Sequence, residues 1–357
     1  MSQPLITSTR FFVGKTADGL ISFGSGQPDL PPPPEVFQVL PGYHNFKYGL
    51  IQGQENLCQA LSAQYPTSRP EQFVITNGAS EALDLVLRVI GNRGAKKVLL
   101  PRPYYYSYPF NVIYAGMEPV YYDLVNGKID VDNFKKMMKG CECVLINSPS
   151  NPTGSVQDVA ALREIESLCQ KAGMYVISDE VYKDLIYERD NYLIQGEKVI
   201  TINSFSKTYA MCGFRVGYLF AREQALVDEV VEMKTHTSMN TNILGQEMAF
   251  AATKVPSEIT NRQVAVWKER RDVIYQGLLD LGLELWKPEG AFYVLPAIKN
   301  SNKVVNDLYY KHKMIVYDGT WFGAPDRIRL SYALDVDKIR EGLKRLGNYL
   351  RTEYRAD

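Results

Sequence analysis

The chain has 357 residues, enough to bury a large core, and it exceeds the usual size of one domain, so two domains are expected. Forty basic residues balance forty acidic ones, and no block of like charge argues for a nucleic-acid or membrane-surface partner. The five cysteines include no C-x-x-C pair, and an odd number suits a reducing compartment. Because no signal peptide and no run of about 18 apolar residues is found, we expect a cytoplasmic protein without a membrane span.

A stretch rich in glycine and proline covers residues 20–41. The four prolines from Pro31 to Pro34 force an extended path before a short helix or turn. This stretch is typical of a linker, but the Gly26 backbone amide, which has no side chain in its way, could also approach a ligand carboxylate. Tyr48 follows in a loop ahead of a helical pattern, and a loop tyrosine is usually a packing residue.

Residues 73–78, FVITNG, are predicted to form a strand and a tight turn, and apolar residues at helical spacing follow them. The turn places the amides of Gly78, Ala79 and Ser80 at the amino terminus of a helix. Free N–H groups and the helix dipole favour a phosphate there. An ordinary cap of the helix end fits this sequence equally well.

Two predicted strands follow, and each ends in residues that could bind a ligand. KVLLPRPYYYSYPF contains a strand and then a run of tyrosines, in which one aromatic ring just past the end of the strand could stack on a planar ring, although an aromatic cluster is more often core. CVLINSPSNPTG is predicted to be a strand that breaks at an N-P-T-G turn, where Asn151 is exposed.

The apolar strand MYVISDEVY ends in two adjacent acids, Asp179 and Glu180. Burying such a charge without a partner is costly, so a functional site explains a carboxylate at this position better than solvent exposure does. A protonated ring nitrogen would be a natural partner of Asp179. A helix cap or a salt bridge is the alternative.

A β-branched run, KVITIN, is predicted to be a buried strand that delivers Ser204 and Lys207 to its carboxyl end, where open α/β sheets keep their ligands. A lysine among neutral neighbours loses its proton easily and can form a Schiff base with a carbonyl. Ser204 and the nearby Arg215 supply donors for a phosphate. The stretch therefore indicates a phosphorylated aldehyde such as pyridoxal 5′-phosphate, and a serine-rich turn with a surface lysine and a salt-bridged arginine is the alternative.

The predicted strands alternate with helical patterns, as in a parallel sheet covered on both faces. Asn151, Asp179 and Lys207 each follow the end of such a strand, so their side chains can converge at one edge of the sheet. FRVGYLFA is expected to carry Arg215 back into the sheet as a further strand.

From residue 256 the pattern changes to a long helix, short strands over LELWKP, AFYVLPA, MIVYDG and RIRLSYA, and further helices. This organisation predicts a large α/β domain over 42–255 and a smaller α+β domain built from 256–357 together with the arm, 1–41. Arg329 alternates with apolar neighbours on one of the short strands. A bidentate arginine suits a substrate carboxylate, whereas an exposed strand arginine is the alternative.

Seven of these segments together, GQPDL, NGASEAL, PSNPTG, SDEVY, SFSK, GFRVGY and IRLSYA, resemble the ordered motifs of the class I/II pyridoxal-phosphate-dependent aminotransferases of the aspartate aminotransferase fold. The likeness covers nearly the whole chain. It implies the fold of these transferases, in which a mostly parallel seven-stranded sheet in a large α/β domain is joined to a smaller α+β domain.

The resemblance also implies roles for individual residues. Lys207 would form the internal aldimine with the cofactor and shuttle the proton, and Asp179 would hold the ring nitrogen protonated. Tyr105 would stack on the ring, with an uncertainty of one residue within 104–106. Asn151 and Tyr182 would contact the ring hydroxyl. The phosphate would be held by the amides of Gly78, Ala79 and Ser80, by Ser204 and Arg215, and by Tyr48 from a neighbouring subunit. The substrate α-carboxylate would be bound by Arg329 with Asn151 and the Gly26 backbone.

The implied activity is ping-pong transfer of an amino group between an L-α-amino acid and a 2-oxo acid, within amino acid metabolism. The catalytic residues would be Lys207, Asp179 and Tyr182, without a metal. A homodimer is expected because Tyr48 is useful only across an interface. A lyase or decarboxylase of the same fold and a non-catalytic regulatory module that binds the cofactor are the alternatives. Ser80 stands where some dicarboxylate-specific relatives carry a lysine, which argues against a preference for aspartate or glutamate. The tyrosine-rich entrance would tolerate an aromatic or apolar substrate, which is slightly favoured over a dicarboxylate.

Overall fold

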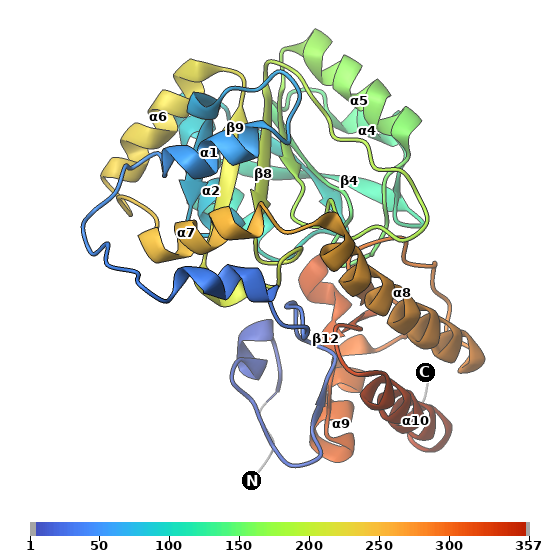
Figure 1. Cartoon of the computed structure of the whole chain (residues 1–357). Coiled ribbons are helices and arrows are strands. Elements are labelled where there is room, and N and C mark those ends of the chain that lie inside the picture. The colour runs from blue at the N-terminus through green and yellow to red at the C-terminus, as the bar shows by residue number, and fades with distance from the viewer. Residues whose placement is uncertain (1–4, 355–357) are drawn as a thin grey trace.

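A computed structural model describes residues 5–354, and its largest element is an eight-stranded sheet in the order β2-β9-β8-β7-β6-β3-β4-β5 (Figure 1). Two strands, β9 (Gly217–Ala221) and β5 (Lys128–Ile129), run against the rest, so the prediction of a mostly parallel sheet is confirmed. The other strands are β2 (Phe73–Thr76), β3 (Lys97–Arg102), β4 (Glu118–Val125), β6 (Cys143–Asn147), β7 (Tyr175–Asp179) and β8 (Val199–Ser204).

The expected number of seven strands is one too small. The additional strand is β5, whose two residues pair with the end of β4. The turn between them contains Asn126 and Gly127, which both have positive φ angles. Asn-Gly is the turn that favours tight hairpins, because both residues tolerate this backbone region.

Helices cover both faces of this sheet, which explains why its central strands are apolar at successive positions rather than at alternate ones. One face packs against α2 (Ala79–Asn92), α3 (Tyr108–Tyr114) and α6 (Gln224–Thr235). The opposite face packs against α1 (Glu55–Ser62) and α7 (Ile243–Ala252) near β2, and against α4 (Val131–Met137) and α5 (Val159–Ala172) near β4.

The remaining helices lie together below this sheet with the amino-terminal arm (Figure 1). They are α8 (Ser257–Asp280), α9 (Ser301–His312) and α10 (Val336–Thr352). The arm joins them through β1 (Ile21–Ser22), which pairs in parallel with β11 (Met314–Ile315). A three-stranded sheet is formed by β10 (Tyr293–Val294), β12 (Tyr317–Asp318) and β13 (Ile328–Ser331). Short 3₁₀ helices cover Thr9–Phe12, Pro34–Val39, Pro70–Gln72, Cys212–Phe214 and Gly319–Phe322.

The strand expected over LELWKP is absent, because residues 283–288 adopt no regular structure. The side chains of this segment are used in other contacts. Trp286 donates its indole N–H to the Thr153 carbonyl at 3.3 Å and lies under the Arg327 guanidinium, 4.6 Å from ring centre to guanidinium carbon. The apolar alternation that predicted a strand is therefore explained by packing against the loop that follows β6.

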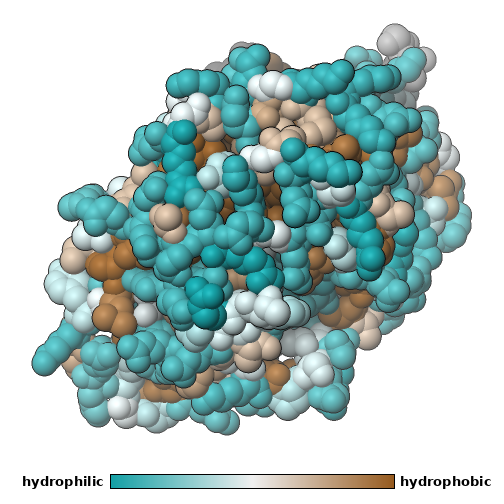
Figure 2. Space-filling model, turned by 90° about the horizontal axis from the view of Figure 1, so that it is seen from above, coloured by the Kyte–Doolittle hydropathy of each residue, from teal (hydrophilic) through white to brown (hydrophobic). Residues whose placement is uncertain are grey.

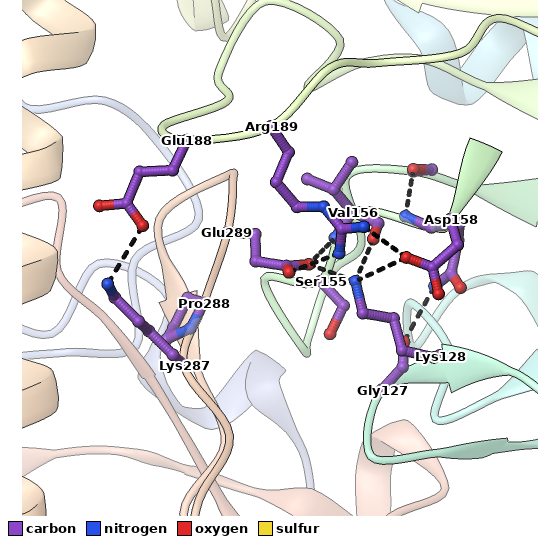
Figure 3. A network of polar contacts seen from close by, with 12 residues as sticks. Gly127, Lys128, Ser155, Val156, Asp158, Glu188, Arg189, Lys287, Pro288 and Glu289 are labelled. Carbon is purple, nitrogen blue, oxygen red and sulfur yellow. Dashed lines mark hydrogen bonds and ion pairs between the residues drawn. The ribbon is translucent and has the colours of Figure 1, made fainter.

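Ion pairs join the two parts of the chain close to that loop (Figure 3). Glu289, just before β10, accepts hydrogen bonds from Lys128 at the start of β5 and from Arg189 Nη1 at 2.6 Å. Arg189 Nη2 also pairs with Asp158 Oδ1 at 2.5 Å. The Glu289 backbone amide donates to the Gly154 carbonyl at 2.8 Å. These contacts hold the N-P-T-G turn against the segment that leads into the smaller sheet.

The surface seen from above is mostly polar, with apolar residues scattered across it (Figure 2). Over residues 5–354, none of the helices combines the length and the apolar character that crossing a bilayer would require.

Candidate active site

A cavity of about 630 Å³ lies at the carboxyl ends of β6, β7 and β8, a volume within the range of roughly 300–1,000 Å³ that is usual for small-molecule sites. It takes in segments that are far apart in the sequence. Of the residues singled out from the sequence, those that line it are Gly26, Ala79, Ser80, Tyr105, Asn151, Asp179, Tyr182, Ser204, Lys207, Arg215 and Arg329. Gly78 and Tyr48 do not line it.

Lys207 lies three residues beyond the end of β8, and its side chain extends into the cavity. Its Nζ donates a hydrogen bond to the Gly26 carbonyl oxygen at 2.5 Å and lies 3.9 Å from Cys212 Sγ. Burial lowers the pKa of Lys207, and the positive charges of Arg329 and Arg215 act in the same direction, against Cys212 and Asp179. The amine therefore loses its proton more easily than an exposed lysine does.

Asp179 is the last residue of β7, and its carboxylate is buried. One oxygen accepts the Tyr108 hydroxyl at 2.6 Å, and the other accepts the Val181 amide at 3.2 Å. Burial raises the pKa of Asp179, although Tyr108, Val181 and Lys207 oppose the shift. A buried carboxylate of this kind is stabilised by a cation. Sequence reasoning missed Tyr108, which lies one helical turn after Tyr105 in the tyrosine run.

Asn151 is 5% exposed, so the expectation that the N-P-T-G turn exposes it is wrong. Two contacts hold it at the cavity wall. Its backbone amide donates to Asn147 Oδ1 at 2.9 Å, and its own Oδ1 accepts Arg329 Nη1 at 3.1 Å. Asn147 also donates to the Asp179 carbonyl at 3.2 Å, so it connects the ends of β6 and β7. Sequence reasoning missed Asn147, although its place at the end of an apolar strand was a usable indication.

Tyr182 follows Asp179 by three residues, and its hydroxyl is 2.7 Å from the Tyr293 hydroxyl. The Tyr182 ring centre lies 5.9 Å from Lys207 Nζ. In the tyrosine run, Tyr105 and Tyr106 line the cavity, whereas Tyr104 packs on Tyr121 with 5.5 Å between ring centres. Tyr293 was also missed, because nothing local marks it as different from other buried strand residues.

Residues 78–80 form the turn into α2, as the sequence predicts. Gly78 differs from its expected role, because its amide donates to the Thr76 carbonyl at 2.8 Å. Its φ angle is +78°, a region that favours glycine, and a Cβ there would lie only 2.5 Å from Arg215 Nη2. Ala79 and Ser80, the first residues of α2, line the cavity with their amides at the helix amino terminus.

Arg215 precedes the sheet instead of lying in a strand as expected, because β9 begins only at Gly217. Its φ angle is +56°, and this left-handed conformation turns the chain before the strand starts. The guanidinium donates to the Cys212 carbonyl at 3.1 Å and to the Asn77 carbonyl at 3.2 Å. Ser204, at the end of β8, accepts the Ser206 amide at 2.9 Å on its hydroxyl oxygen.

Arg329 lies in β13 and is 2% exposed. Its Nη2 donates to the Gly24 carbonyl at 2.6 Å, and its Nε has no hydrogen-bond partner among residues 5–354. The guanidinium carbon is 4.6 to 4.7 Å from the ring centres of Tyr293, Tyr317 and Phe322. A buried donor without a partner at a cavity wall can be satisfied by a ligand oxygen.

These features fit a phosphorylated pyridine aldehyde. Asp179 offers a buried carboxylate for a ring nitrogen, and Lys207 offers an amine with a lowered pKa for an aldehyde. The start of α2 offers free amides for a phosphate, beside the Arg215 guanidinium that closes over Gly78.

Comparisons with known proteins identify the family. The family model for aminotransferases of class I and II matches residues 18–346. The chain belongs to this family. The enzyme is therefore a pyridoxal-phosphate-dependent aminotransferase, as its motifs predicted, and it transfers amino groups between amino acids and 2-oxo acids.

Relatives of this aminotransferase are similar over almost their whole length. The aspartate aminotransferase of Bacillus subtilis is 28% identical, over 93% of this chain and 91% of the relative. A probable aspartate/prephenate aminotransferase of Aquifex aeolicus is 30% identical, over 96% and 95% of the two chains.

Solved structures of aminotransferases also resemble this chain over almost its whole length. The aspartate aminotransferase of Thermotoga maritima superposes with a TM-score of 0.88 at 27% identity, over 96% of this chain and 95% of that chain. The aromatic aminotransferase of Pyrococcus horikoshii gives 0.87 at 28% identity, over 96% and 99%. The predicted fold class is thereby confirmed.

Proposed function

We propose that Lys207, Asp179 and Tyr182 are the catalytic residues of this aminotransferase. The observation that carries the proposal is that Lys207 and Asp179, from the ends of neighbouring strands, share one cavity in which burial lowers the pKa of the amine. When bound, the cofactor supplies an electron sink for the bond that breaks at the substrate Cα. Lys207 Nζ accepts the Cα proton and holds it beside the reacting carbon. The Tyr182 hydroxyl orients the cofactor that Lys207 binds.

The other cofactor contacts follow from the walls of the cavity. Tyr105 stacks on the ring, which is supported by its position beside Tyr108, the donor to Asp179, with 5.4 Å between ring centres. Asn151 and Tyr182 bind the ring hydroxyl. The phosphate is bound by the Ala79 and Ser80 amides, Ser204 and Arg215. Gly78 contributes by shape rather than by its amide, because that amide is already used within the turn.

Arg329 binds the α-carboxylate of the substrate. The support is its unpartnered Nε, together with the link from Nη1 to Asn151, which lets the arginine and the amide present donors side by side. The Gly26 backbone completes this binding site, because Gly26 lines the same cavity and its carbonyl accepts a hydrogen bond from Lys207 Nζ. A carboxylate bound in this way fixes the substrate so that its Cα proton faces the Lys207 amine.

We infer that the preferred amino donor has a neutral side chain, aromatic or apolar. Among residues 5–354, the cationic side chains that line the cavity are Lys207, Arg215 and Arg329, and each already has a role. Phe12, Tyr106 and Tyr317 form an aromatic part of the cavity wall, and the Tyr317 ring centre lies 4.7 Å from the Arg329 guanidinium carbon. A second substrate carboxylate would enter this wall without a countercharge, which is unfavourable.

The proposal includes a homodimer in which Tyr48 reaches the phosphate of the other copy. Tyr48 is 82% exposed, and Phe46 and Leu50 beside it are 84% and 56% exposed. Large apolar side chains that are exposed together are typical of an interface.

Borohydride reduction of the holoenzyme, followed by peptide mapping, tests the catalytic assignment. We expect the cofactor to be fixed on Lys207, and a Lys207→Arg variant to give no labelled peptide. A label on another lysine would contradict the assignment.

Single amino acids added to the holoenzyme test the donor preference, with the loss of visible cofactor absorbance as the readout. Phenylalanine, tyrosine and leucine should react about tenfold faster than aspartate. A side-chain carboxylate without a cationic partner costs about 1.4 kcal/mol, which corresponds to a factor of ten. Faster reaction with aspartate would indicate that a partner subunit supplies a cation, and it would overturn the neutral-donor proposal.

A further inference from the structure

Lys234 is a fully buried lysine that does not line the active-site cavity. It lies in α6 with its side chain 0% exposed, and its Nζ is 3.1 Å from Glu81 Oε2 and 2.9 Å from Ser238 Oγ. Burying an ammonium group is unfavourable unless it is paired, so the helix pair α2 and α6 depends on this contact. Nothing in the reaction described above uses Lys234 directly.

Glu81 connects Lys234 to the turn before α2. One of its carboxylate oxygens accepts the Asn77 backbone amide at 2.6 Å, and both oxygens accept the Asn77 side-chain amide at 3.1 Å. The Asn77 carbonyl in turn accepts Arg215 Nη2 at 3.2 Å. A continuous chain of polar contacts therefore runs from Lys234 in α6 through Glu81 and Asn77 to the guanidinium at the cavity.

The charges of this chain matter for a phosphate. A carboxylate in the first turn of α2 stabilises the helix but repels an anion bound at the same helix end. Burial would raise the pKa of Glu81, but Ser238, Asn77 and Lys234 lower it overall, so the side chain is ionised. The Lys234 ammonium offsets this negative charge at 3.1 Å, while both carboxylate oxygens accept hydrogen bonds from Asn77.

We propose that Lys234 is a positioning residue for the cofactor phosphate, acting through Glu81 and Asn77 on Arg215 and on the amides of Ala79 and Ser80. The inference rests on the proposed role of these groups as the phosphate site. It makes Glu81 the hydrogen-bond acceptor that fixes the turn, and Lys234 the cation that keeps this acceptor in place.

The test compares two ligands that differ only in the phosphate. Full-length apoenzyme is titrated with pyridoxal 5′-phosphate and with pyridoxal, and each dissociation constant is measured from the visible absorbance. In Lys234→Met, the dissociation constant of the phosphorylated ligand should rise on the order of tenfold, while that of pyridoxal stays unchanged. Lys128→Met, which breaks the ion pair with Glu289 outside the phosphate turn, should leave the ratio of the two constants as in the wild type.

Two double variants keep the test decisive if Lys234→Met folds poorly. Both Glu81→Gln/Lys234→Met and Glu81→Leu/Lys234→Met remove the charge pair, but only glutamine retains an acceptor for Asn77. The glutamine variant should keep the wild-type ratio of the two dissociation constants. In the leucine variant, the preference for the phosphorylated ligand should be about tenfold smaller.

The outcomes separate this inference from the proposed site. Equal losses for both ligands in Lys234→Met, or equal preference in the two double variants, would overturn the positioning role alone. A wild-type enzyme that binds pyridoxal as tightly as pyridoxal 5′-phosphate would overturn the phosphate site, and the positioning role with it.

Discussion

The contact between Tyr108 and Asp179 shows how a residue outside the expected set can control one inside it. Tyr108 is buried and its hydroxyl donates to the carboxylate at 2.6 Å. This donor opposes the rise in the pKa of Asp179 that burial causes. It therefore helps to keep Asp179 ionised, which is the form that a protonated ring nitrogen needs.

Tyr108→Phe removes that donor and leaves the ring. The pKa of Asp179 should rise further, so the acidic limb of the kcat/KM profile should move to higher pH. A hydrogen bond to a charged group worth ~1.5 kcal/mol should move the limb by about one pH unit, so the activity on the limb should fall about tenfold. Tyr104→Phe, whose ring packs on Tyr121 away from the cavity, is the control. An acidic limb that does not move would show that Tyr108 serves packing alone.

Glu180 follows Asp179, and its buried carboxylate accepts the Tyr65 hydroxyl at 3.2 Å. Burial raises the pKa of Glu180 from 4.5 to about 7, although Lys183 and hydrogen bonds from Ser178, Tyr65 and Thr201 oppose this. Because the folded state holds this proton more tightly than the unfolded state, the contribution of Glu180 to stability is complete below pH 4.5. It is lost as the pH rises to 7.

Glu180→Gln should remove this dependence. Between pH 5 and pH 8 the wild type should lose up to ~3 kcal/mol more of its free energy of unfolding than the variant does, from about 1.4 kcal/mol per unit of pKa shift. Denaturant unfolding at both pH values measures the difference, with Glu258→Gln at the exposed start of α8 as the control. Equal pH slopes for wild type and Glu180→Gln would refute the expectation.

At the scale of elements, the start of α2 depends on backbone geometry that only glycine adopts without strain. Gly78 has a φ angle of +78°, and a Cβ would come within 2.5 Å of the Arg215 guanidinium. The turn thus brings a cation close to the helix amino terminus, where a larger residue would keep it away.

Gly78→Ala is expected to weaken binding of pyridoxal 5′-phosphate and to cost about 1–3 kcal/mol of stability, because φ +78° with ψ 169° is a backbone conformation that is essentially restricted to glycine. Gly116 has almost the same φ angle, +77°, but a Cβ there would meet nothing within 4 Å. Gly116→Ala should therefore lose stability through its positive φ angle while the cofactor affinity stays unchanged. If both variants bind the cofactor equally well, the close approach of Arg215 to Gly78 has no role in binding.

At the scale of the whole molecule, the active site joins two parts of the chain. Arg329 reaches Gly24 across 305 positions of sequence. The ion pairs of Glu289 join the two parts at the segment that leads into β10 (Figure 3). The division into 42–255, and 1–41 with 256–357, stays a prediction. It agrees with the pairing of β1 to β11 and with a hydrophobic core shared by the arm and α8 to α10.

The dimer can be tested by mixing two impaired variants. Lys207→Ala and Tyr48→Ala should each lose most activity as homodimers. In a mixed dimer one site regains both residues, so refolding the two together should restore activity up to about a quarter of the wild-type level, by the statistics of pairing. A double variant refolded alone is the control. Failure to regain activity, with dimers present, would show that Tyr48 does not act across the interface.

Local patterns were sufficient to predict much of this protein. The strands that end at Asn147, Asp179 and Ser204 could be located from apolar runs and turn residues, and parallel strands bring their ends together at one edge. Lys207 and Asp179 could be selected because a lysine or a carboxylate at such an edge is costly without a function. Ordered motifs then predicted the family.

The tertiary structure alone decided the contacts between residues that are distant in sequence. Tyr108 donates to Asp179, and Lys234 pairs with Glu81. The sequence around Tyr108 and around Lys234 contains no pattern that would predict either partner. Residues 283–288 alternate like a strand yet form none, because their side chains pack on another loop. Sequence periodicity reports which side of an element is buried, whereas the partner on that side is chosen by packing and charge across the whole fold.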